Sequence, residues 1–476
     1  MPATLGILAL AATLTATPIA HKPETVQVRM RDGSRVEVPA PPSSRAARPR
    51  IVEFRQAPGV IKGTLFDRFR RDLGGAVAAS ATENGRPRAA VPTREFHRTF
   101  RGVAVTLDDA QADAVRRFAY VKAVHEDGEV QAFAEDTTRI TRIRADRVWN
   151  ELKSRGEGIR VAVIDTGIDY NHPALAARYL AGGIDFVDGD DDPMDEHGHG
   201  THVAGIVAGD SADVQGVAPA ARVMAYRVLD EYGRGSDSTV IAGIERAVDP
   251  NGDGDLSDRV DIINLSLGGY GDADDPVSQS VDRAVMAGVV VFAAAGNTPG
   301  GQTIGSPAAA RLAITVGNSD RDDVMHPTSS SGPSFPDFSM KPEIAAPGEA
   351  IRSAKRGGGT LVASGTSMAS PHAAGVAALL LALHRDWTPA DVKAALTASA
   401  KPLDTEVMRQ GAGRIDAYGA ATVPAAIAPA VLSIGRSPSK DAWTTTRTVR
   451  ITNRAAEART FTAKAVVPGG VQMTVE

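Results

Sequence analysis

The chain has 476 residues, too many for one ordinary hydrophobic core, and this length predicts about three domains. Its composition of 43% hydrophobic and 23% charged residues is globular, and its net charge of −5 excludes the basic surface typical of nucleic-acid-binding proteins. Cysteine is absent, which excludes disulfides and a thiolate nucleophile and leaves oxygen or imidazole ligands for any metal.

The first 50 residues show no pattern of a folded domain. Residues 1–20 form an apolar run of the length of a signal-peptide core, too short to span a bilayer comfortably. No Lys or Arg precedes the run, so a buried helix is the alternative. We expect a signal peptide and a secreted protein, either free or associated with the cell surface. Residues 21–50 are polar and predict a linker, and no later stretch is expected to reach transmembrane length.

Residues 51–134 alternate between strand and helix patterns. A strand at "RIVEFR" is followed by a basic segment, by alternation in "FHRTFRGVAVTL", by a helix capped by Asp108 and by a strand at "KAVHEDGEVQAF". Residue types that perform catalysis are scattered here, not clustered. We therefore predict a small α+β domain of βαβ type with an accessory role.

Residues 140–424 alternate short, nearly continuous apolar runs with helical stretches. Buried strands that alternate with crossover helices predict an α/β domain with a doubly wound, mainly parallel sheet and helices on both faces. Ligands of such sheets bind at the carboxyl ends of the strands. The expected strands are "IRVAVID", "ARVMAYRVL", "VDIINLSLG", "GVVVFAAAG" and "LAITVG", and the expected helices are "HVAGIVAG", "STVIAGIERAV", "SQSVDRAVMAG", "MASPHAAGVAALLLALH" and "TPADVKAALTASA".

Residues 425–476 are rich in Thr and Val, alternate in polarity and contain a Pro-Gly-Gly turn. They predict two or three strands of an antiparallel domain, too few to close a sandwich. We expect a partial β domain of the fibronectin type III kind, truncated at Glu476.

Asp165 ends the apolar strand "IRVAVID", so it lies at the sheet edge where a site is expected. A turn cap is the plain alternative for this carboxylate. Asp-Thr-Gly is also the active-site tripeptide of aspartic peptidases, which need two such carboxylates that share a proton. No second Asp-Thr-Gly or Asp-Ser-Gly occurs in the chain, so this alternative is disfavoured.

Three histidines, His197, His199 and His202, lie close together in "DEHGHGTHVAG". They could form a metal site, although the His-Glu-x-x-His spacing of zinc hydrolases is missing. A general base needs only one imidazole, oriented by a carboxylate at its other nitrogen. The local pattern leaves both interpretations open.

Two further side chains follow turns at the ends of apolar elements. Ser367 precedes a long apolar helix, where free backbone N–H groups favour a developing oxyanion. Asn297 ends "VVVFAAAGN", and its amide could donate to the same oxyanion. A helix cap and a turn residue are the plain alternatives. The Gly-x-Ser-x-Gly elbow of α/β-hydrolases is not matched, because Ala369 takes its last position.

Six motifs occur in one order: "VAVIDTGID", "HGHGTHVAG", "INLSLGG", "AAAGN", "KPEIAAPG" and "SGTSMASPHAAGVAAL". On these motifs, about residues 145–420 resemble the subtilisin-like serine peptidase family. The resemblance implies a serine endopeptidase that acts on proteins or peptides. It implies Ser367 as the nucleophile, His199 as the general base and acid, Asp165 as the group that orients the imidazole, and Asn297 as the oxyanion donor.

The same resemblance implies roles for neighbouring segments. Ser266, Leu267 and Gly268 would form an edge that pairs with the substrate backbone. Residues 51–134 are similar to the propeptide of these peptidases, a folding chaperone and intramolecular inhibitor, and imply a self-processing precursor cut within about 133–144. An N-terminal interaction domain is the alternative. We expect a monomer with no nucleic-acid partner.

The segment "DPNGDGDLSDRVD" follows the spacing of an EF-hand-like loop. Val260 stands at the twelfth position, where a Glu is usual, so Asp258 or Asp261 would have to replace that ligand. An acidic turn is the alternative, and the run "DFVDGDDDPMDEH" is a weaker candidate. We expect structural calcium and no organic cofactor. The expected ligands are Asp249, Asn251, Asp253, Asp255 and Ser257.

Two functions of other classes remain as hypotheses. One is a calcium-dependent surface-binding protein whose peptidase domain is inactive. The other is a metallohydrolase built on the three histidines.

Overall fold

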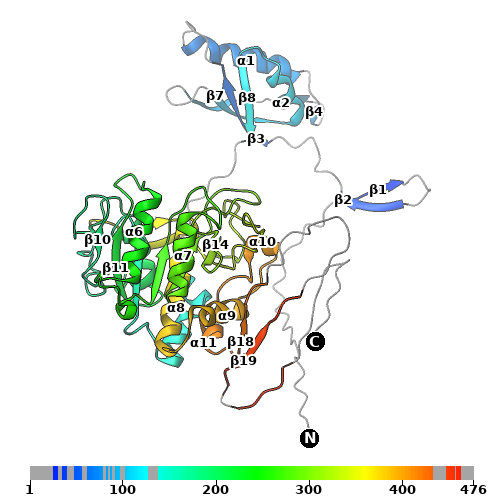
Figure 1. Ribbon diagram of the computed structural model, residues 1–476. Coiled ribbons are helices and arrows are strands. Elements are labelled where there is room, and N and C mark those ends of the chain that lie inside the picture. The colour runs from blue at the N-terminus through cyan, green and yellow to red at the C-terminus, as the bar shows by residue number, and fades with distance from the viewer. Residues whose placement is uncertain are drawn as a thin grey trace. The chain divides into compact units, whose positions relative to one another are not determined.

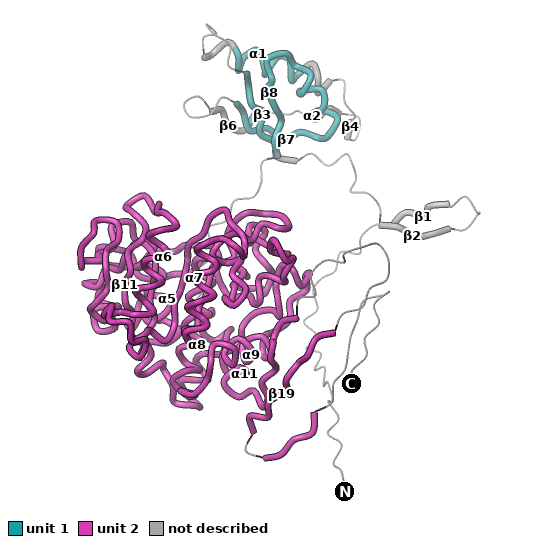
Figure 2. The backbone as a smooth tube through the Cα atoms, in the orientation of Figure 1, with its two compact units in different colours: residues 1–132 teal, residues 133–476 magenta. Residues whose placement is uncertain are grey.

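The computed structural model divides into two compact units, residues 1–132 and residues 133–476 (Figure 1; Figure 2). The predicted signal peptide, residues 1–20, lies outside the described residues. The described residues are 25–29, 35–39, 48–55, 62–78, 82–83, 86–87, 92–96, 102–126, 138–432, 446–455 and 457–461.

The described residues of the first unit form a four-stranded sheet in the order β6-β7-β3-β8 and two helices. Phe54 of β3 packs against Phe66 and Phe69 of α1 in the core of this unit. Helix α2 begins after Asp108, whose side chain accepts a hydrogen bond from Gln111 N at 2.7 Å. The elements are β3 (Arg48–Phe54), α1 (Lys62–Ala78), β4 (Thr82–Glu83), β5 (Arg86–Pro87), β6 (Pro92–Phe96), β7 (Gly102–Leu107), α2 (Asp109–Arg116) and β8 (Val121–Glu126).

Two predictions for this part of the chain were wrong. The βαβ interpretation implies parallel neighbours, whereas every strand pair in the four-stranded sheet is antiparallel. Periodicity identifies strands but not their partners. The segment 21–50, predicted as a linker, contains the antiparallel strands β1 (Thr25–Arg29) and β2 (Arg35–Pro39), and β3 already begins at Arg48. The alternation of "TVQVR" and "RVEVP", with Asp-Gly between them in the sequence, is a hairpin signal that the polar composition concealed.

The second unit is built on a seven-stranded sheet in which every pair is parallel. The strand order is β10-β11-β9-β12-β13-β14-β15, which confirms the predicted doubly wound α/β fold. The direction of winding reverses at β9, since later strands are added first on its β11 side and then on its β12 side. The strands are β9 (Arg160–Asp165), β10 (Ile184–Asp185), β11 (Arg222–Arg227), β12 (Ile262–Leu265), β13 (Val290–Ala294), β14 (Ile314–Ser319) and β15 (Ile344–Pro347).

Helices cover both faces of this sheet because strand residues alternate between two cores (Figure 1). Val161 and Val163 of β9 belong to the core that also contains residues of α5, α8 and α9, whereas Ala162 and Ile164 belong to the core that contains residues of α6 and α7. Burial on both faces explains the continuous apolar runs. The helices are α3 (Arg139–Arg142), α4 (Ala145–Arg147), η1 (Val148–Leu152), α5 (His199–Ala208), α6 (Asp237–Val248), η2 (Leu256–Asp258), α7 (Pro276–Met286), α8 (Thr366–Leu383), α9 (Pro389–Ser399), α10 (Val407–Gln410) and α11 (Ala417–Ala421).

Helix α8 is, among the described residues, the one helix long and apolar enough to cross a membrane by length and composition. This finding differs from the expectation that no stretch after the N-terminal run reaches transmembrane length. Of this helix, 83% is buried inside the structure. Its apolar residues pack against the sheet, so core packing accounts for its composition.

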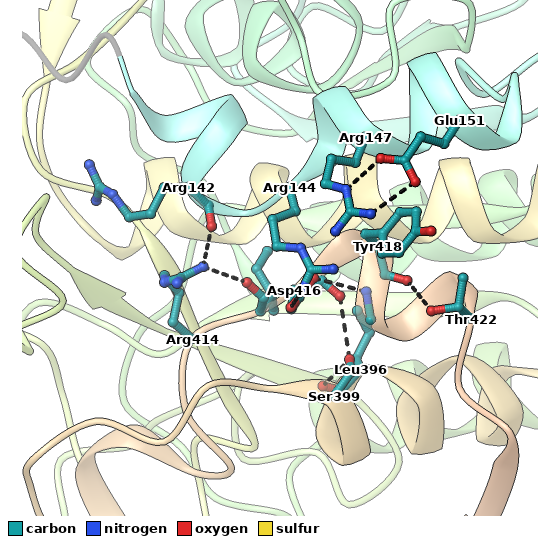
Figure 3. Close-up of polar contacts among 12 residues, drawn as sticks. Arg142, Arg144, Arg147, Glu151, Leu396, Ser399, Arg414, Asp416, Tyr418 and Thr422 are labelled. Carbon is teal, nitrogen blue, oxygen red and sulfur yellow. Dashed lines mark hydrogen bonds and ion pairs between the residues drawn. The ribbon is translucent and has the colours of Figure 1, made fainter. Parts of the chain in front are cut away.

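Polar contacts tie the beginning of the second unit to its last helix (Figure 3). Arg144 Nη1 lies 2.6 Å from Asp416 Oδ2, and the Arg147 guanidinium lies 3.7 Å from the centre of the Tyr418 ring. Arg147 also pairs with Glu151, at 2.6 Å. These contacts hold α4 and η1 against α11.

Two antiparallel strand pairs lie outside the seven-stranded sheet of the second unit. Strands β16 (Ile351–Ala354) and β17 (Thr360–Ala363) pair with each other, as do β18 (Ala425–Ala428) and β19 (Arg450–Asn453). Arg454 pairs with Asp391 of α9, and its guanidinium lies 4.8 Å from the centre of the Trp387 ring, so these contacts join the end of β19 to α9. The fibronectin type III assignment for residues 425–476 stays a prediction, because two strands of that segment are described.

Candidate active site

The predicted site residues follow the carboxyl ends of adjacent strands. Asp165 is the last residue of β9, Ser266 follows β12 directly, and Asn297 follows β13 after a short turn. These three strands are neighbours in the sheet. Because parallel strands end at the same edge, the residues meet at the switch point where open α/β sheets bind their ligands.

His199 begins helix α5, and its ring faces Asp165. His199 Nδ1 lies 2.7 Å from Oδ1 of the completely buried Asp165, which also accepts a hydrogen bond from Thr166 N at 2.8 Å. Burial alone would lower the pKa of His199, but the charge of Asp165 and its hydrogen bond outweigh burial, so the pKa is raised from its ordinary value. Since Nδ1 faces Asp165, Nε2 is the nitrogen available for proton transfer.

Ser367 is the second residue of α8, where backbone N–H groups have no partner within the helix. Its Oγ donates to the carbonyl oxygen of Ser266 at 3.1 Å. Asn297 Oδ1 accepts hydrogen bonds from Thr366 N at 3.0 Å and Thr366 Oγ1 at 3.2 Å. Because Thr366 occupies the amide oxygen, the amide nitrogen of Asn297 is the end left to donate beside Ser367.

One groove, with a volume of about 1130 Å³, brings these residues together. His199, Asn297, Ser367 and the segment 266–268 all line it, and Asp165 lies buried behind His199. The structure therefore places a carboxylate, an imidazole, a hydroxyl and an amide donor at one open site. Such a set can perform nucleophilic acyl transfer.

The three histidines do not converge. His202 Nε2 lies 3.1 Å from the carbonyl oxygen of Ile351 and 3.0 Å from that of Leu361, and burial lowers the pKa of His202 to about 4. The His197 ring lies 6.3 Å from the His199 ring, centre to centre. In the part of the chain that the structure describes, no three His, Cys, Asp or Glu side chains are placed to hold a metal ion. This arrangement favours His199 as a base over a histidine metal site.

Comparisons with known proteins agree with this geometry. A model of the family described as the subtilase family matches residues 156–419, more than half of the chain. The chain belongs to the subtilase family. A second family model, described as peptidase inhibitor I9, matches residues 72–133, within the segment predicted as a propeptide.

Individual subtilases are similar over much of the chain. Subtilisin NAT from Bacillus subtilis subsp. natto is 37% identical over 325 residues, which are 67% of this chain and 80% of that protein. An intracellular serine protease from Paenibacillus polymyxa is 38% identical over 288 residues, 57% of this chain and 82% of the relative. The crystal structure of a cold adapted subtilisin-like serine proteinase matches with 34% sequence identity and a TM-score of 0.48. The match covers 55% of this chain and 88% of the chain in that structure. The protein is thus a subtilisin-like serine endopeptidase with an I9-type propeptide domain.

Asp195 is a site residue of this subtilase to which sequence reasoning assigned no role. It is completely buried, and Oδ1 accepts from Thr166 Oγ1 at 2.9 Å and Gly198 N at 2.7 Å, while Oδ2 accepts from Thr201 N at 2.8 Å. One carboxylate therefore joins the end of β9 to the start of α5. The sequence shows that an Asp close to a Gly turn can accept local backbone hydrogen bonds. It does not show that this Asp also binds Thr166, which lies on a distant segment.

The predicted calcium loop lies between α6 and β12, before the amino end of β12 and hence away from the groove. Asp249 accepts backbone hydrogen bonds from Gly252 and Gly254 at 2.9 Å each, so the loop folds around this carboxylate. The expected ligands are exposed or partly exposed oxygen donors, which suit Ca²⁺, although their carboxylates do not converge on one point.

The two candidates for the replacement ligand differ. Asp261 Oδ2 already accepts from Arg160 N at 2.8 Å, at the start of β9. Asp258 Oδ1 is buried without a hydrogen-bond partner among the described residues. A buried carboxylate oxygen that lacks a donor suits a cation, so Asp258 is the better replacement of the two.

Proposed function

We propose that this subtilase hydrolyses peptide bonds of proteins through an acyl-enzyme formed on Ser367. The observation that carries the proposal is the 2.7 Å pair of His199 Nδ1 and Asp165 Oδ1, next to the groove that Ser367 also lines. Ser367 Oγ attacks the substrate carbonyl carbon while His199 Nε2 takes its proton and later gives it to the leaving amine. Asp165 keeps Nδ1 protonated and stabilises the imidazolium. Water then releases the acyl group by the same steps, and labelling of Ser367 by a fluorophosphonate tests the role.

The Ser367 hydroxyl has to turn before it reacts. Its hydrogen is directed at Ser266 O, so the hydroxyl has to reorient before it can donate to His199 Nε2. Catalytic hydrogen bonds commonly tighten only when substrate binds, so this geometry is compatible with the proposed role.

The developing oxyanion would accept from two donors. One is the backbone N–H of Ser367 at the N-terminus of α8, and the other is Asn297 Nδ2, which the bonds between Thr366 and Asn297 Oδ1 leave free to donate. An extended substrate would add a strand beside Ser266, Leu267 and Gly268, at the wall of the groove.

Asn297→Ala is expected to lower kcat about 100- to 1000-fold with little change in KM, the size of effect known for the equivalent donor of a subtilisin. The amide acts on a charge that exists only in the transition state, so substrate binding is spared. Steady-state kinetics on a chromogenic peptide measure the change. Thr298→Ala, at the next residue of the groove wall, is the control and should keep kcat near the wild-type value. A rise in KM with unchanged kcat would contradict the oxyanion role.

We propose further that the protein is made as a precursor that cuts itself, with the first unit as its intramolecular inhibitor. The match of residues 72–133 to peptidase inhibitor I9 supports the inhibitor role. The sequence predicts a cut within about 133–144. Arg139 and Ile140 are buried in the second unit, and Arg139 Nη2 donates to Gln215 O at 2.6 Å, which favours the part of this segment before Thr138.

Export and the monomeric state are proposals on sequence grounds. The apolar run of residues 1–20 supports a signal peptide and secretion, with attachment to the cell surface as the alternative. Family membership does not decide the location, because one relative is named an intracellular protease. N-terminal sequencing of protein recovered from the medium and from washed cells checks the location.

We also propose that the loop 249–257 binds a structural calcium ion, supported by its oxygen donors and by the unpartnered Asp258 oxygen. Calcium at 100 times its Kd would stabilise the folded state by about 2.7 kcal/mol, which raises Tm by roughly 4 °C for a unit of this size. Thermal melting with calcium and with a calcium-selective chelator measures the shift. Asp253→Asn should abolish it, and Asp191→Asn, in the other acidic loop, should not. An unchanged wild-type Tm would contradict the site.

A further inference from the structure

The carbonyl group of Ser367 lies at a gap in the hydrogen bonding of helix α8. In an α-helix each carbonyl accepts from the N–H four residues later, and residue 371 of this helix is Pro, which has no N–H. The hydroxyl of Ser266 supplies the missing donor, since its Oγ donates to Ser367 O at 2.8 Å. A side chain at the end of β12 therefore completes the first turn of α8.

Ser266 and Ser367 are thereby joined by two hydrogen bonds. Ser266 Oγ donates to Ser367 O, and Ser367 Oγ donates to Ser266 O at 3.1 Å. The backbone of Ser367 carries both the hydroxyl and the N–H group of the proposed oxyanion site. The direction of one hydroxyl hydrogen, that of Ser266, thus affects the position of both.

Two buried side chains determine that direction. Asn264 Nδ2 donates to Ser266 Oγ at 2.9 Å, and Ser370 Oγ donates to Asn264 Oδ1 at 2.8 Å. Asn264 and Ser370 are completely buried, and Ser266 is 3% exposed. We call the series Ser370, Asn264, Ser266 and Ser367 O the hydroxyl–amide chain. Bulk water does not reach Ser370 or Asn264.

Each bond of the hydroxyl–amide chain orients the next. Because Ser370 donates to the amide oxygen of Asn264, the amide NH₂ group has to face Ser266. Because Ser266 Oγ accepts from that NH₂ group, its single hydrogen is directed at Ser367 O. With the amide reversed, Ser266 would have to donate to Asn264, and the carbonyl of Ser367 would lose its donor.

We propose that Asn264 and Ser370 are positioning residues of the active site, which hold Ser367 in place through Ser266. The proposal rests on the proposed role of Ser367 as the nucleophile. Neither Asn264 nor Ser370 lines the groove, so neither contacts substrate. Their loss should therefore change the reaction of Ser367 and leave substrate binding unaffected.

Ser370→Ala removes the first donor of the chain. Because a net hydrogen bond contributes about 0.5–1.5 kcal/mol, kcat and the rate constant of fluorophosphonate labelling should fall about 2- to 13-fold, with KM within about twofold of wild type. Asn264→Asp has the same shape and keeps the acceptor for Ser370, but an ionised carboxylate cannot donate to Ser266. It should lower kcat further, on the order of 10- to 100-fold.

Ser154→Ala is the matched control. Ser154 is buried, and its Oγ donates to Leu379 O at 3.1 Å. Leu379 lies on α8, as Ser367 does, but about three turns further along the helix. The Ser154→Ala variant should lose thermal stability to a similar extent as Ser370→Ala and keep the wild-type kcat. All variants are expressed from the full chain and compared by thermal melting, peptide kinetics and labelling rate.

Wild-type kcat in Ser370→Ala, or an equal loss of kcat in Ser370→Ala and Ser154→Ala, would overturn the positioning role. Should Asn264→Asp fail to fold, the comparison of the two serine variants decides alone. A wild-type protein that does not react with the fluorophosphonate would instead refute the role of Ser367, an outcome distinct from failure of the hydroxyl–amide chain.

Discussion

Replacing Ser367 with alanine is expected to abolish hydrolysis of protein substrates and to leave the precursor uncut. The replacement removes the attacking oxygen but keeps the groove, the backbone N–H and the Asp165–His199 pair. In a subtilisin, a member of the same family, loss of the nucleophile lowers kcat by about a millionfold. Casein hydrolysis and fluorophosphonate labelling measure the loss of activity, and the size of the accumulated chain shows whether the precursor is cut.

The control for this variant is cleavage in trans. A folded but inactive precursor should be cut when wild-type enzyme is added, and its Tm should match that of the wild-type precursor. A Ser367→Ala protein that still matures by itself or still labels would show that another residue is the nucleophile. Failure of wild type to hydrolyse any protein would favour the alternative of a binding protein with an inactive peptidase domain.

Asp165→Asn is expected to lower kcat by about 10,000-fold, the second-largest effect at this site. An asparagine of the same shape can present an N–H to His199 Nδ1, which then becomes the acceptor and leaves the hydrogen on Nε2. Nε2 cannot take the Ser367 proton in that tautomer. Burst-phase or steady-state kinetics on an activated ester and a peptide measure the loss.

The same variant should shift the pH profile. In the wild type, burial lowers the pKa of His199 but Asp165 raises it by charge and hydrogen bonding, with a net increase. Removing the charge leaves burial unopposed by Asp165, so the pKa of His199 falls and the acid limb of the kcat/KM profile moves to lower pH. Glu231→Gln, an exposed carboxylate in a nearby loop, controls for net charge and should leave the limb in place. A limb that stays or moves to higher pH would contradict the Asp165–His199 coupling.

The sheet of the second unit was predictable because burial on both faces leaves a strong local pattern. Runs such as "IRVAVID" are apolar at consecutive positions, and the structure places their alternate residues in two cores. The first unit was less predictable. Its strands were recognised, but their antiparallel pairing and the hairpin at 25–39 depend on partners that periodicity does not report.

The sequence likewise predicts some residues of the candidate site and not others. Asp165, His199, Asn297 and Ser367 stand in short motifs whose order is typical of subtilases, so the sequence alone predicts them. Asp195 lies two residues before the motif "HGHGTHVAG" and received no predicted role, since its partner Thr166 lies on another segment. The calcium loop follows a local spacing, and its ligands stay predictions because their side chains do not converge.

The sequence by itself determined the fold class of the second unit, the enzyme family and the residue types of the site, because apolar periodicity and motif order are local properties of the chain. Only the tertiary structure decided which nitrogen of His199 faces Asp165 and that Ser266 replaces the donor missing at Pro371. Only the structure decided that Asn264 and Ser370 support that bond. These are hydrogen bonds between segments about a hundred residues apart in several cases, and they require atoms within about 3 Å and in the right direction, which no local pattern specifies.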